Sequence, residues 1–402
     1  MTSDSMGLAT RLVHEGTLRS QFGETSEALF LTSGFVYDSA EQAEATFTGE
    51  AEHYQYTRFG NPNLTMLQDR LAWLEGAEAC RVTPTGMAAV HGALMADLRA
   101  GDRVVAARAL FGSCHWIVST LLPRLGIETE FVDGCDLEDW RRALSRPART
   151  VLIETPSNPM LDVLDIAAIA ELAHRAGARL VVDNVFATPL QQKPLSLGAD
   201  VVVYSCTKHI DGQGRVLGGA VLGGRDWIEQ SVQPFLRNTG ATLSPFNAWV
   251  LLKGLETLGL RVAQATRSAG LIADRLAAHP MVAELRYPGR ADHEQHALAA
   301  RQMQGFGTLL SFTVRGGKSA AFATLNALKL IAISNNLGDS RSMVTHPATT
   351  THMRIGADER ARLGISDGAI RLSVGIEDAA DLIADLDQAL TRAAGTLGKD
   401  AA

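Results

Sequence analysis

The segment Ser205–His209 places a lysine where it could take part in chemistry. Lys208 follows an apolar run, residues 199–204, that predicts a buried strand, and the hydroxyl residues Ser205 and Thr207 stand beside it. A rigid strand end holds an amine in one orientation, and neighbouring hydroxyls can bind phosphate. This arrangement suits a lysine that forms a Schiff base. A lone lysine after a strand is ordinarily a surface residue, so the interpretation depends on the rest of the chain.

An acidic residue stands upstream, in the order that a pyridoxal phosphate site requires. Asp183 ends a second apolar run, 25 residues before Lys208. Pyridoxal phosphate needs an acid facing its pyridine nitrogen, because the protonated ring is the electron acceptor of its chemistry. By itself Asp183 could equally be a solvated acid at a strand end. Its position relative to Lys208 favours the functional interpretation.

A glycine at the start of a helical run supplies the third signal. The run follows Gly86 in the segment Thr83–Ala89. Glycine lets the backbone approach a ligand closely, and the first amides of a helix bind phosphate. Gly86 alone could be a plain glycine at a helix start. With Asp183 and Lys208, it predicts a pyridoxal phosphate site.

These residues lie in segments that resemble the cystathionine gamma-synthase family of pyridoxal phosphate enzymes, also called the Cys/Met metabolism family. The resemblance covers nearly the whole chain, and its segments are Tyr54–Pro62, Thr85–Ala89, Glu154–Pro159, Asp183–Pro189, Ser205–His209, Asn335–Asp339, Thr345–His352 and Arg371–Glu377. Within the family, residues 208–215 and 334–338 look most like the O-succinylhomoserine sulfhydrylases. Those enzymes make homocysteine from an activated homoserine and sulfide.

The resemblance implies how the cofactor is held. Lys208 is expected to carry pyridoxal 5'-phosphate as a Schiff base and then to move protons as the catalytic residue. Ser205, Thr207 and the backbone at Gly86 and Met87 are expected to bind the phosphate. No metal is expected in this chemistry.

The resemblance also assigns residues to the substrate and to a second subunit. Arg371 matches the arginine that clamps the substrate carboxylate, a task suited to a planar guanidinium, and Asn336 is expected beside it. Asn158 is expected near the phenolic oxygen of the cofactor, although asparagine in Ser-Asn-Pro is also a common turn former. Tyr56 and Arg58 match positions that reach the phosphate from the neighbouring subunit. The family therefore implies a homo-oligomer, a tetramer built as a dimer of dimers.

Two residues depart from the family pattern. Most relatives have tyrosine at the position of Phe111, and phenylalanine can stack on the pyridine ring but cannot transfer a proton. Lys208 is therefore expected to carry more of the proton transfer. Val185 replaces the usual threonine two residues after Asp183, which removes one hydroxyl near the cofactor.

The expected reaction is gamma-replacement on O-succinyl-L-homoserine by sulfide, which releases succinate and makes L-homocysteine. The alternatives are a cystathionine gamma-synthase, an O-acetylhomoserine sulfhydrylase, a gamma-lyase and, from another class, a non-catalytic scaffold. The intact Lys208, Asp183 and Arg371 argue against the scaffold. The cation that would meet the succinyl carboxylate stays open. Its candidates are Arg108, Arg215 and Arg341.

The composition agrees with a cytoplasmic metabolic enzyme. The 402 residues are 46% hydrophobic, enough for a large core, and the net charge of -7 offers no footprint for nucleic acid or an anionic membrane. The four cysteines have no CxxC spacing, which favours a reducing compartment over a zinc or disulfide framework. The opening residues 1–5 lack a basic region, and no apolar run is long enough to span a membrane.

The order of patterns predicts an α/β chain of fold type I. Residues 1–62 lack a regular period and are expected to form an arm that reaches the neighbouring subunit's site. In the cofactor-binding part, 63–255, predicted helices at 85–98, 113–125 and 165–176 alternate with predicted strands at 103–107, 151–154, 180–183 and 201–205, which indicates a mainly parallel sheet between helices. Ligands bind at the carboxyl ends of such strands. A connecting helix over 245–279, broken near Gly259 and Gly270, then leads into a smaller α/β domain within 256–402.

Overall fold

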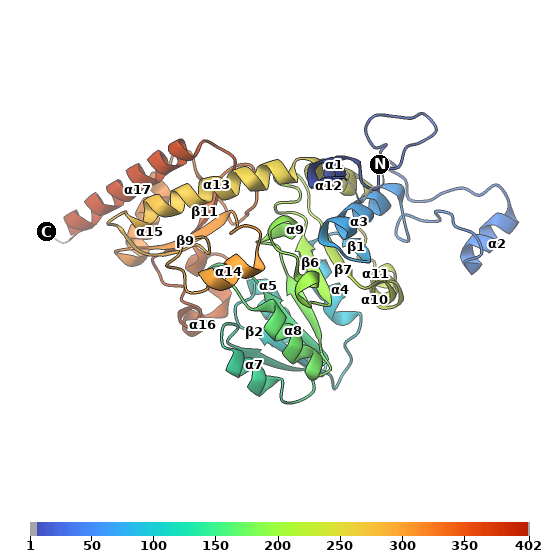
Figure 1. Cartoon of the computed structure of the whole chain (residues 1–402), viewed down its shortest axis with the longest axis horizontal. Helices are drawn as coiled ribbons and strands as arrows, with labels where there is room; N and C mark the ends of the chain where they lie inside the picture. Colours follow the sequence, from blue (N-terminus) through green and yellow to red (C-terminus); the bar gives the residue numbers. More distant parts are fainter. Residues whose placement is uncertain (1–5, 401–402) are drawn as a thin grey trace.

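The computed structural model describes residues 6–400, with side chains to residue 395. Residues 1–5, on which part of the expectation about the N-terminus depends, lie outside this range. Two sheets, joined by a long helix, form the body of the molecule, and an N-terminal arm projects from it (Figure 1). Among the described helices, none combines the length and apolar composition needed to cross a membrane.

The larger sheet has seven strands in the order β1-β7-β6-β5-β4-β2-β3. Their bounds are β1 Ala79–Thr83, β2 Arg103–Ala107, β3 Glu128–Val132, β4 Thr150–Glu154, β5 Arg179–Asp183, β6 Val201–Ser205 and β7 Gly219–Gly223. The pairs from β3 to β6 are parallel, and β7 runs antiparallel to both β6 and β1. The mainly parallel sheet is confirmed, and the antiparallel β7 was not foreseen.

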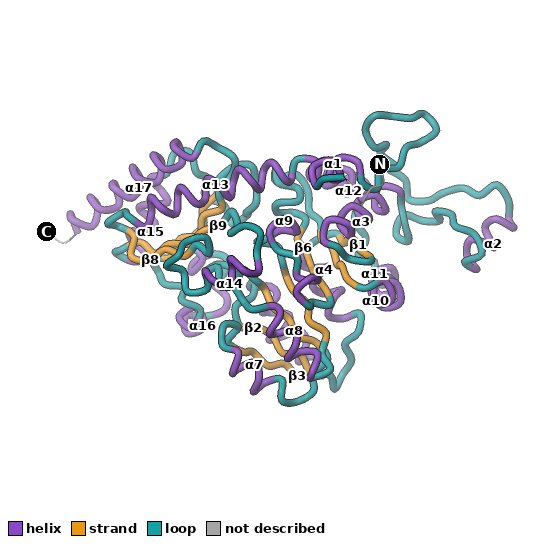
Figure 2. Tube along the Cα trace, in the orientation of Figure 1, coloured by secondary structure: helices purple, strands orange, loops and turns teal. Residues whose placement is uncertain are grey.

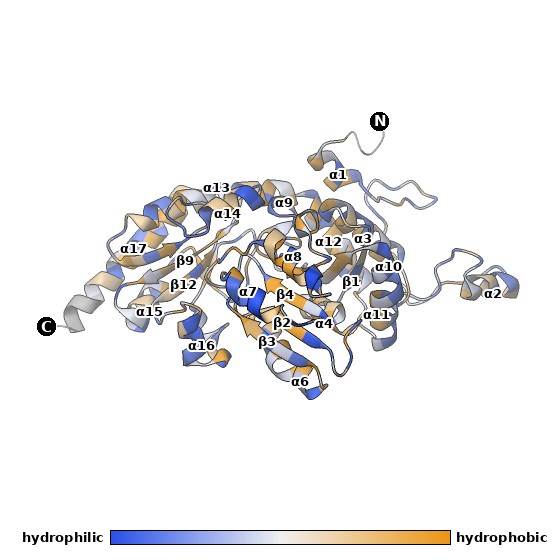
Figure 3. Cartoon of the chain, turned by 60° about the horizontal axis from the view of Figure 1, so that its bottom comes forward, coloured by the Kyte–Doolittle hydropathy of each residue, from blue (hydrophilic) through white to orange (hydrophobic). Residues whose placement is uncertain are grey.

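Alternate residues of the buried strands face opposite helix layers. On β6, Val201 and Val203 pack in the cluster that includes α4 (Gly86–Met95), whereas Val202 and Tyr204 pack in the cluster that includes α3 (Pro62–Glu75) and α12 (Pro245–Glu256). Helices α7 (Leu137–Ala143) and α8 (Ile166–Arg175) cover the β4 and β5 part of that second face. Both faces of the larger sheet are therefore buried against helices, which explains why its central strands are nearly continuous apolar runs. Figure 3 shows the same concentration of apolar residues in the central strands.

The connecting helix is broken at a different place from the one expected. Helix α12 ends at Glu256 and α13 begins at Leu258, so the break falls at Thr257, and α13 (Leu258–Ala277) continues through Gly259 and Gly270. Glycine inside a helix costs about 1 kcal/mol relative to alanine. Burial of one face of α13, including Leu276, outweighs this cost.

The smaller sheet has five strands in the order β10-β11-β12-β9-β8. Their bounds are β8 Val282–Arg286, β9 Leu309–Val314, β10 Ala332–Ile333, β11 Met343–Thr345 and β12 Ala369–Ser373. Helices α13, α15 (Gly317–Ala327) and α17 (Ala379–Asp400) share an apolar cluster with this sheet.

The arm contains two short helices that were not expected. Helix α1 (Leu8–His14) buries Leu12 against the body, whereas α2 (Ala40–Thr48) lies at the tip of a long excursion that is mostly loop (Figures 1 and 2). The two sides of this excursion meet at its base, in an isolated bridge between Gly34 and Tyr56.

The remaining helices lie on the faces of the sheets and in the loops. They are α5 Gly112–Trp116, α6 Leu122–Arg124, α9 Thr188–Gln191, α10 Arg225–Trp227, α11 Gln233–Thr239, α14 His296–Gln302 and α16 Ala357–Arg362, with π turns Ile117–Leu121 and Ile228–Val232 and 3-10 turns Pro194–Leu197, Pro347–Thr349 and Met353–Ile355.

Candidate active site

Lys208 lies in the turn that follows β6 and points to the smaller sheet. Its Nζ donates a hydrogen bond to Asn336 Oδ1 at 2.8 Å. Burial, and secondly the positive charge of Arg371, lower the pKa of Lys208 to about 8. A larger fraction of this amine is therefore neutral near pH 7 than of an ordinary lysine, and only the neutral amine is a nucleophile or a base.

The predicted phosphate end of the site is built by close approach of two segments. A Cβ on Gly86 would stand 2.6 Å from Ser205 Cβ, so only glycine fits here. Thr85 caps α4: its hydroxyl accepts from the amide of Ala88 and its carbonyl from that of Ala89. Within residues 6–400, the amides of Gly86 and Met87 make no hydrogen bond, and they are the two that remain for an anion.

The hydroxyl of Thr207 already has partners. It accepts from the amide of Gly218 at 3.1 Å and lies 3.3 Å from the carbonyl oxygen of the same residue. This pairing fixes the turn after β6. For Thr207 to donate to a phosphate, it must give up the longer contact.

Asp183 is the last residue of β5 and is paired with Val203 of the neighbouring strand β6. Its Oδ1 accepts from the amide of Val185 at 3.1 Å, and burial raises the pKa of Asp183 to about 6. The backbone of Val185 thus orients the carboxylate, while its side chain packs with Leu161, Phe186, Leu309 and Leu337. The departure from threonine gives this position an apolar contact between the two sheets in place of a hydroxyl.

Arg371 is nearly fully buried, with an exposed fraction of 2%, in β12. Its Nη1 donates to Asn158 Oδ1 at 2.9 Å, and its Nη2 donates to the carbonyls of Asn335 at 3.0 Å and Asn336 at 3.3 Å. Its Nε is buried without a hydrogen-bond partner among the described residues. Burial lowers the pKa of Arg371 to about 10, so the guanidinium stays charged at neutral pH and can take an anion.

Asn336 therefore joins the two ends of the site. Its side chain accepts from Lys208 and its carbonyl accepts from Arg371. The loop reaches this position because Gly338 has a positive φ of 70° and lies against His209, where a Cβ would be 2.6 Å from the His209 amide nitrogen. The structure thus brings together Lys208, Asn336, Arg371 and Asn158.

Glu154 is a member of this site that was not singled out from the sequence. It ends β4 beside Asp183 of β5, with the two in register, and its carboxylate accepts from the amides of Phe111 and Asn158. Burial, and secondly the charge of Asp183, raise the pKa of Glu154. The available signal was its position at the carboxyl end of a strand, in a segment that carries the family resemblance.

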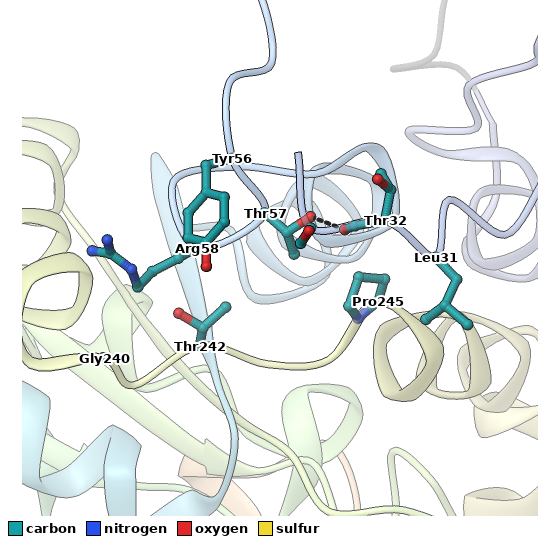
Figure 4. Close-up of a pocket in the computed structure, with 9 residues that line it drawn as sticks. Leu31, Thr32, Tyr56, Thr57, Arg58, Gly240, Thr242 and Pro245 are labelled. Carbon is teal, nitrogen blue, oxygen red and sulfur yellow. Dashed lines mark hydrogen bonds between the residues drawn. The ribbon is translucent and has the colours of Figure 1, made fainter. Parts of the chain in front are cut away.

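Tyr56 and Arg58 are not brought to Lys208 within one chain. Both line a pocket with Leu31, Thr242 and Pro245, and none of the residues around Lys208 lines that pocket (Figure 4). The guanidinium of Arg58 donates to the carbonyl of Arg237 and lies 4.9 Å from the centre of the Phe59 ring. Tyr56 is 44% exposed.

The three candidate cations for a second substrate carboxylate differ in their partners. Arg108 pairs with Glu359 at 3.2 Å, and Arg215 pairs with Asp211 at 2.9 Å. Arg341 is exposed and has no ion pair among residues 6–395. A charge without an internal partner is the one most readily used for a ligand.

The site fits pyridoxal phosphate on several independent observations. It has a buried amine of lowered pKa, a buried acid at the next strand end, two unpaired helix amides against a glycine that cannot carry a side chain, and a buried arginine with a free N–H. When bound, this cofactor withdraws electrons from the substrate carbon next to the amine. Fold and site together define a fold-type-I pyridoxal phosphate enzyme.

Comparison with known proteins agrees with this class. Residues 9–391 match the model of the Cys/Met metabolism PLP-dependent enzyme family, and the chain belongs to that family. It is similar to the O-succinylhomoserine sulfhydrylase of Mycobacterium tuberculosis, at 56% identity over 96% of this chain and 97% of that protein. It is also similar to the O-succinylhomoserine sulfhydrylase of Pseudomonas aeruginosa, at 44% identity over 97% of each.

A solved structure shares the whole fold. The cystathionine gamma synthase of Xanthomonas oryzae, in complex with aminoacrylate and cysteine, matches with a TM-score of 0.93 and 38% identity, over 97% of this chain and 99% of that one. The predicted family, fold class and cofactor are thus confirmed.

Proposed function

We propose that the chain catalyses gamma-replacement on O-succinyl-L-homoserine with sulfide and makes L-homocysteine. The bond between the gamma carbon and the ester oxygen breaks, succinate leaves, and a carbon–sulfur bond forms in its place, with a proton released from the sulfide. The similarity to two O-succinylhomoserine sulfhydrylases, at 56% and 44% identity over nearly full length, carries this proposal.

The residues of the site have roles that follow from their positions. We assign Lys208 to the removal and return of protons on the substrate carbons, because Phe111 has no hydroxyl to share this work. Asp183 would keep the pyridine nitrogen protonated. Arg371 would bind the substrate carboxylate with Asn336 beside it, and Asn158 would face the cofactor's phenolic oxygen. Ser205, with the amides of Gly86 and Met87, would bind the phosphate.

The choice of sulfide over cysteine follows from the chemistry of burial. Sulfide needs only access to the gamma carbon, whereas cysteine brings an amino group and a carboxylate that require their own partners. Phe111 supplies no such partner. For the leaving group, the succinyl carboxylate needs a cation, and the internal pairing of Arg108 and Arg215 leaves Arg341 as our assignment.

A product analysis tests the reaction. We expect purified enzyme with O-succinylhomoserine to give homocysteine with sulfide at a kcat/KM at least about 10-fold above that for cystathionine formation with cysteine, because the cysteine polar groups would be desolvated without partners. O-acetylhomoserine should react less well. Parallel reactions with each ester, each nucleophile and no nucleophile, with products separated, measure this.

Each other outcome identifies an alternative. A higher kcat/KM with cysteine would indicate a cystathionine gamma-synthase, and a preference for the acetyl ester would indicate an O-acetylhomoserine sulfhydrylase. A 2-oxo acid as main product without a nucleophile would indicate a gamma-lyase. A protein that binds no cofactor, and so has no visible absorbance, would be a scaffold.

We further propose that the arm completes the site of a second copy of the chain. The arm exposes apolar side chains that a monomer leaves in water: Phe22 is 85%, Val36 89% and Phe47 69% exposed. Burial of such side chains stabilises an interface. With Tyr56 and Arg58 near the base of the arm, this supports a dimer with shared sites, and the family implies a tetramer of two such dimers.

Mixed subunits test the shared site. Arg58→Ala should weaken retention of the cofactor, because it removes a charge from the phosphate end. When inactive Arg58→Ala and inactive Lys208→Ala subunits are exchanged, one hybrid site per dimer has both wild-type residues, so about a quarter of sites in a statistical mixture should be active. Activity that fails to return, although mass spectrometry shows that the subunits have exchanged, would contradict shared sites.

The division of the chain and its location are proposals of the same kind. We divide the chain into the arm, 1–62, the cofactor-binding part, 63–255, and the C-terminal domain, 256–402, because the two sheets have separate apolar clusters. The four cysteines are free thiols, which supports action in the reducing cytoplasm.

A further inference from the structure

Glu154 occupies a position that none of the proposed catalytic steps explains. It ends β4 with an exposed fraction of 5%. Its Oε2 accepts from the amide of Phe111 at 2.6 Å, and its Oε1 accepts from the amide of Asn158 at 3.0 Å. One buried carboxylate thus holds the backbone of two residues that are 47 positions apart in the chain.

The contact needs a group with two acceptor oxygens, one for each amide N–H. A carboxylate has no hydrogen to donate, so each oxygen can face an amide N–H without conflict, and hydrogen bonds to a charged group are stronger than neutral ones. Burial and the second acid, Asp183, raise the pKa of Glu154, whereas the two amide donors lower it and so favour the charged form. The positive charge of Arg371 also lowers the pKa of Glu154.

The first amide belongs to Phe111, whose ring has no polar group that could orient it by a hydrogen bond. Phe111 precedes α5, is half-buried, and packs against the apolar cluster on the α4 face of the sheet. A tyrosine at this position could be oriented through its hydroxyl, but a phenyl ring cannot. The orientation of Phe111 therefore depends on packing and on its backbone, which Glu154 anchors.

The second amide fixes the partner of the substrate arginine. Asn158 is buried, and its Oδ1 accepts from Arg371 Nη1 at 2.9 Å. Displacement of the Asn158 backbone would move this oxygen and remove one of the hydrogen bonds that orient the guanidinium. The positions of Phe111 and Arg371 thus depend on the same carboxylate.

We propose that Glu154 is a positioning residue that couples the ring over the cofactor to the clamp on the substrate carboxylate. Its carboxylate sets the backbone of Phe111 and Asn158 together, and through Asn158 it sets Arg371. The inference rests on the function proposed above.

Glu154→Gln tests this role with little change in size. The amide group keeps one acceptor oxygen but turns an NH2 toward the other backbone N–H, so one hydrogen bond is lost and two donors oppose each other. We expect kcat/KM for O-succinylhomoserine to fall about 10- to 100-fold, mainly through a higher KM. The dissociation constant of pyridoxal phosphate, titrated into the apoprotein, should rise about 10-fold. The visible circular dichroism of the bound cofactor should change.

A chemically matched control separates positioning from general stability. Asp385 of α17 is also a buried carboxylate, and it accepts from the amides of Lys329, Leu330 and Ile331 at 2.9 to 3.0 Å. Asp385→Asn should lower the thermal midpoint and leave KM, cofactor affinity and visible circular dichroism at wild-type values.

The result that overturns the proposal is a Glu154→Gln enzyme whose KM, cofactor affinity and circular dichroism match those of Asp385→Asn. If Glu154→Gln does not fold, Glu154→Asp decides by the same three measurements, because its shorter side chain keeps the carboxyl group but cannot bring both oxygens to the two amides. A wild-type enzyme that binds the cofactor but does not make homocysteine would refute the proposed function instead, and would leave the cofactor measurements on Glu154 valid.

Discussion

Replacing Lys208 with alanine is expected to lower kcat at least about 1000-fold, because one substitution removes both the covalent attachment of the cofactor and the base. The fold should survive. The side chain lies in the turn after β6, makes one hydrogen bond to Asn336, and belongs to neither apolar cluster of the larger sheet. Removal of a partly buried amine also relieves the desolvation that lowers its pKa to about 8. Borohydride reduction followed by dialysis measures covalent attachment through retained absorbance.

Lys193 provides the control for this experiment. It is an exposed lysine of the same part of the chain, so Lys193→Ala should retain the cofactor after borohydride treatment, as wild type does. A Lys208→Ala protein that kept wild-type absorbance after the same treatment would refute the assignment of the lysine.

Replacing Arg371 with lysine is expected to lower kcat/KM for the amino acid substrate about 100-fold, with the absorbance of the resting enzyme nearly unchanged. Lysine keeps a charge but lacks the planar fork. It cannot reach Asn158 Oδ1 and the carbonyls of residues 335 and 336 while also presenting two N–H groups to a carboxylate. Steady-state kinetics over a range of substrate concentrations, with spectra of the resting enzyme, measure both effects.

The matched control is a buried arginine outside the site. Arg103 begins β2, at the opposite end of the strands, and donates to the carbonyl of Ala143 while it pairs with Glu130. Arg103→Lys should lower the thermal midpoint and leave kcat/KM intact. If Arg371→Lys kept the wild-type kcat/KM, another cation would have to bind the substrate carboxylate.

The parts of the site that could be predicted from the sequence are those with local signals. Lys208 and Asp183 each follow an apolar run that is buried on both faces, and Gly86 stands at a helix start, so strand ends and helix amides were visible without the fold. The departures at Phe111 and Val185 were also visible, but their consequences depended on contacts. Only the structure shows that the Val185 amide orients Asp183.

What could not be predicted depends on pairings between distant segments. Hydrophobic runs do not give the direction of a partner strand, so the antiparallel β7 was not recognisable. The role proposed for Glu154 depends on its contact with Phe111, and no sequence motif links these two distant residues. Helix α2 lies on an excursion that leaves the apolar side chains of Val36 and Phe47 exposed. Prediction of a helix from the sequence depends on apolar residues that recur on one face packed against a core.

The loop around Gly338 has a consequence for how this enzyme can change over generations. The groups proposed to hold the cofactor lie at or just after strand ends of the larger sheet and at the start of α4. Asn336 and Arg371, proposed to face the amino acid, lie in the loop after β10 and in β12 of the smaller sheet. Substitutions in the smaller sheet and its loops can therefore alter the preferred substrate while the lysine, acid and helix amides stay in place. Gly338 itself is excluded from this variation, because any side chain there would collide with His209 and separate the two halves. Such an architecture is expected to give a family whose members share one cofactor chemistry but differ in their substrates.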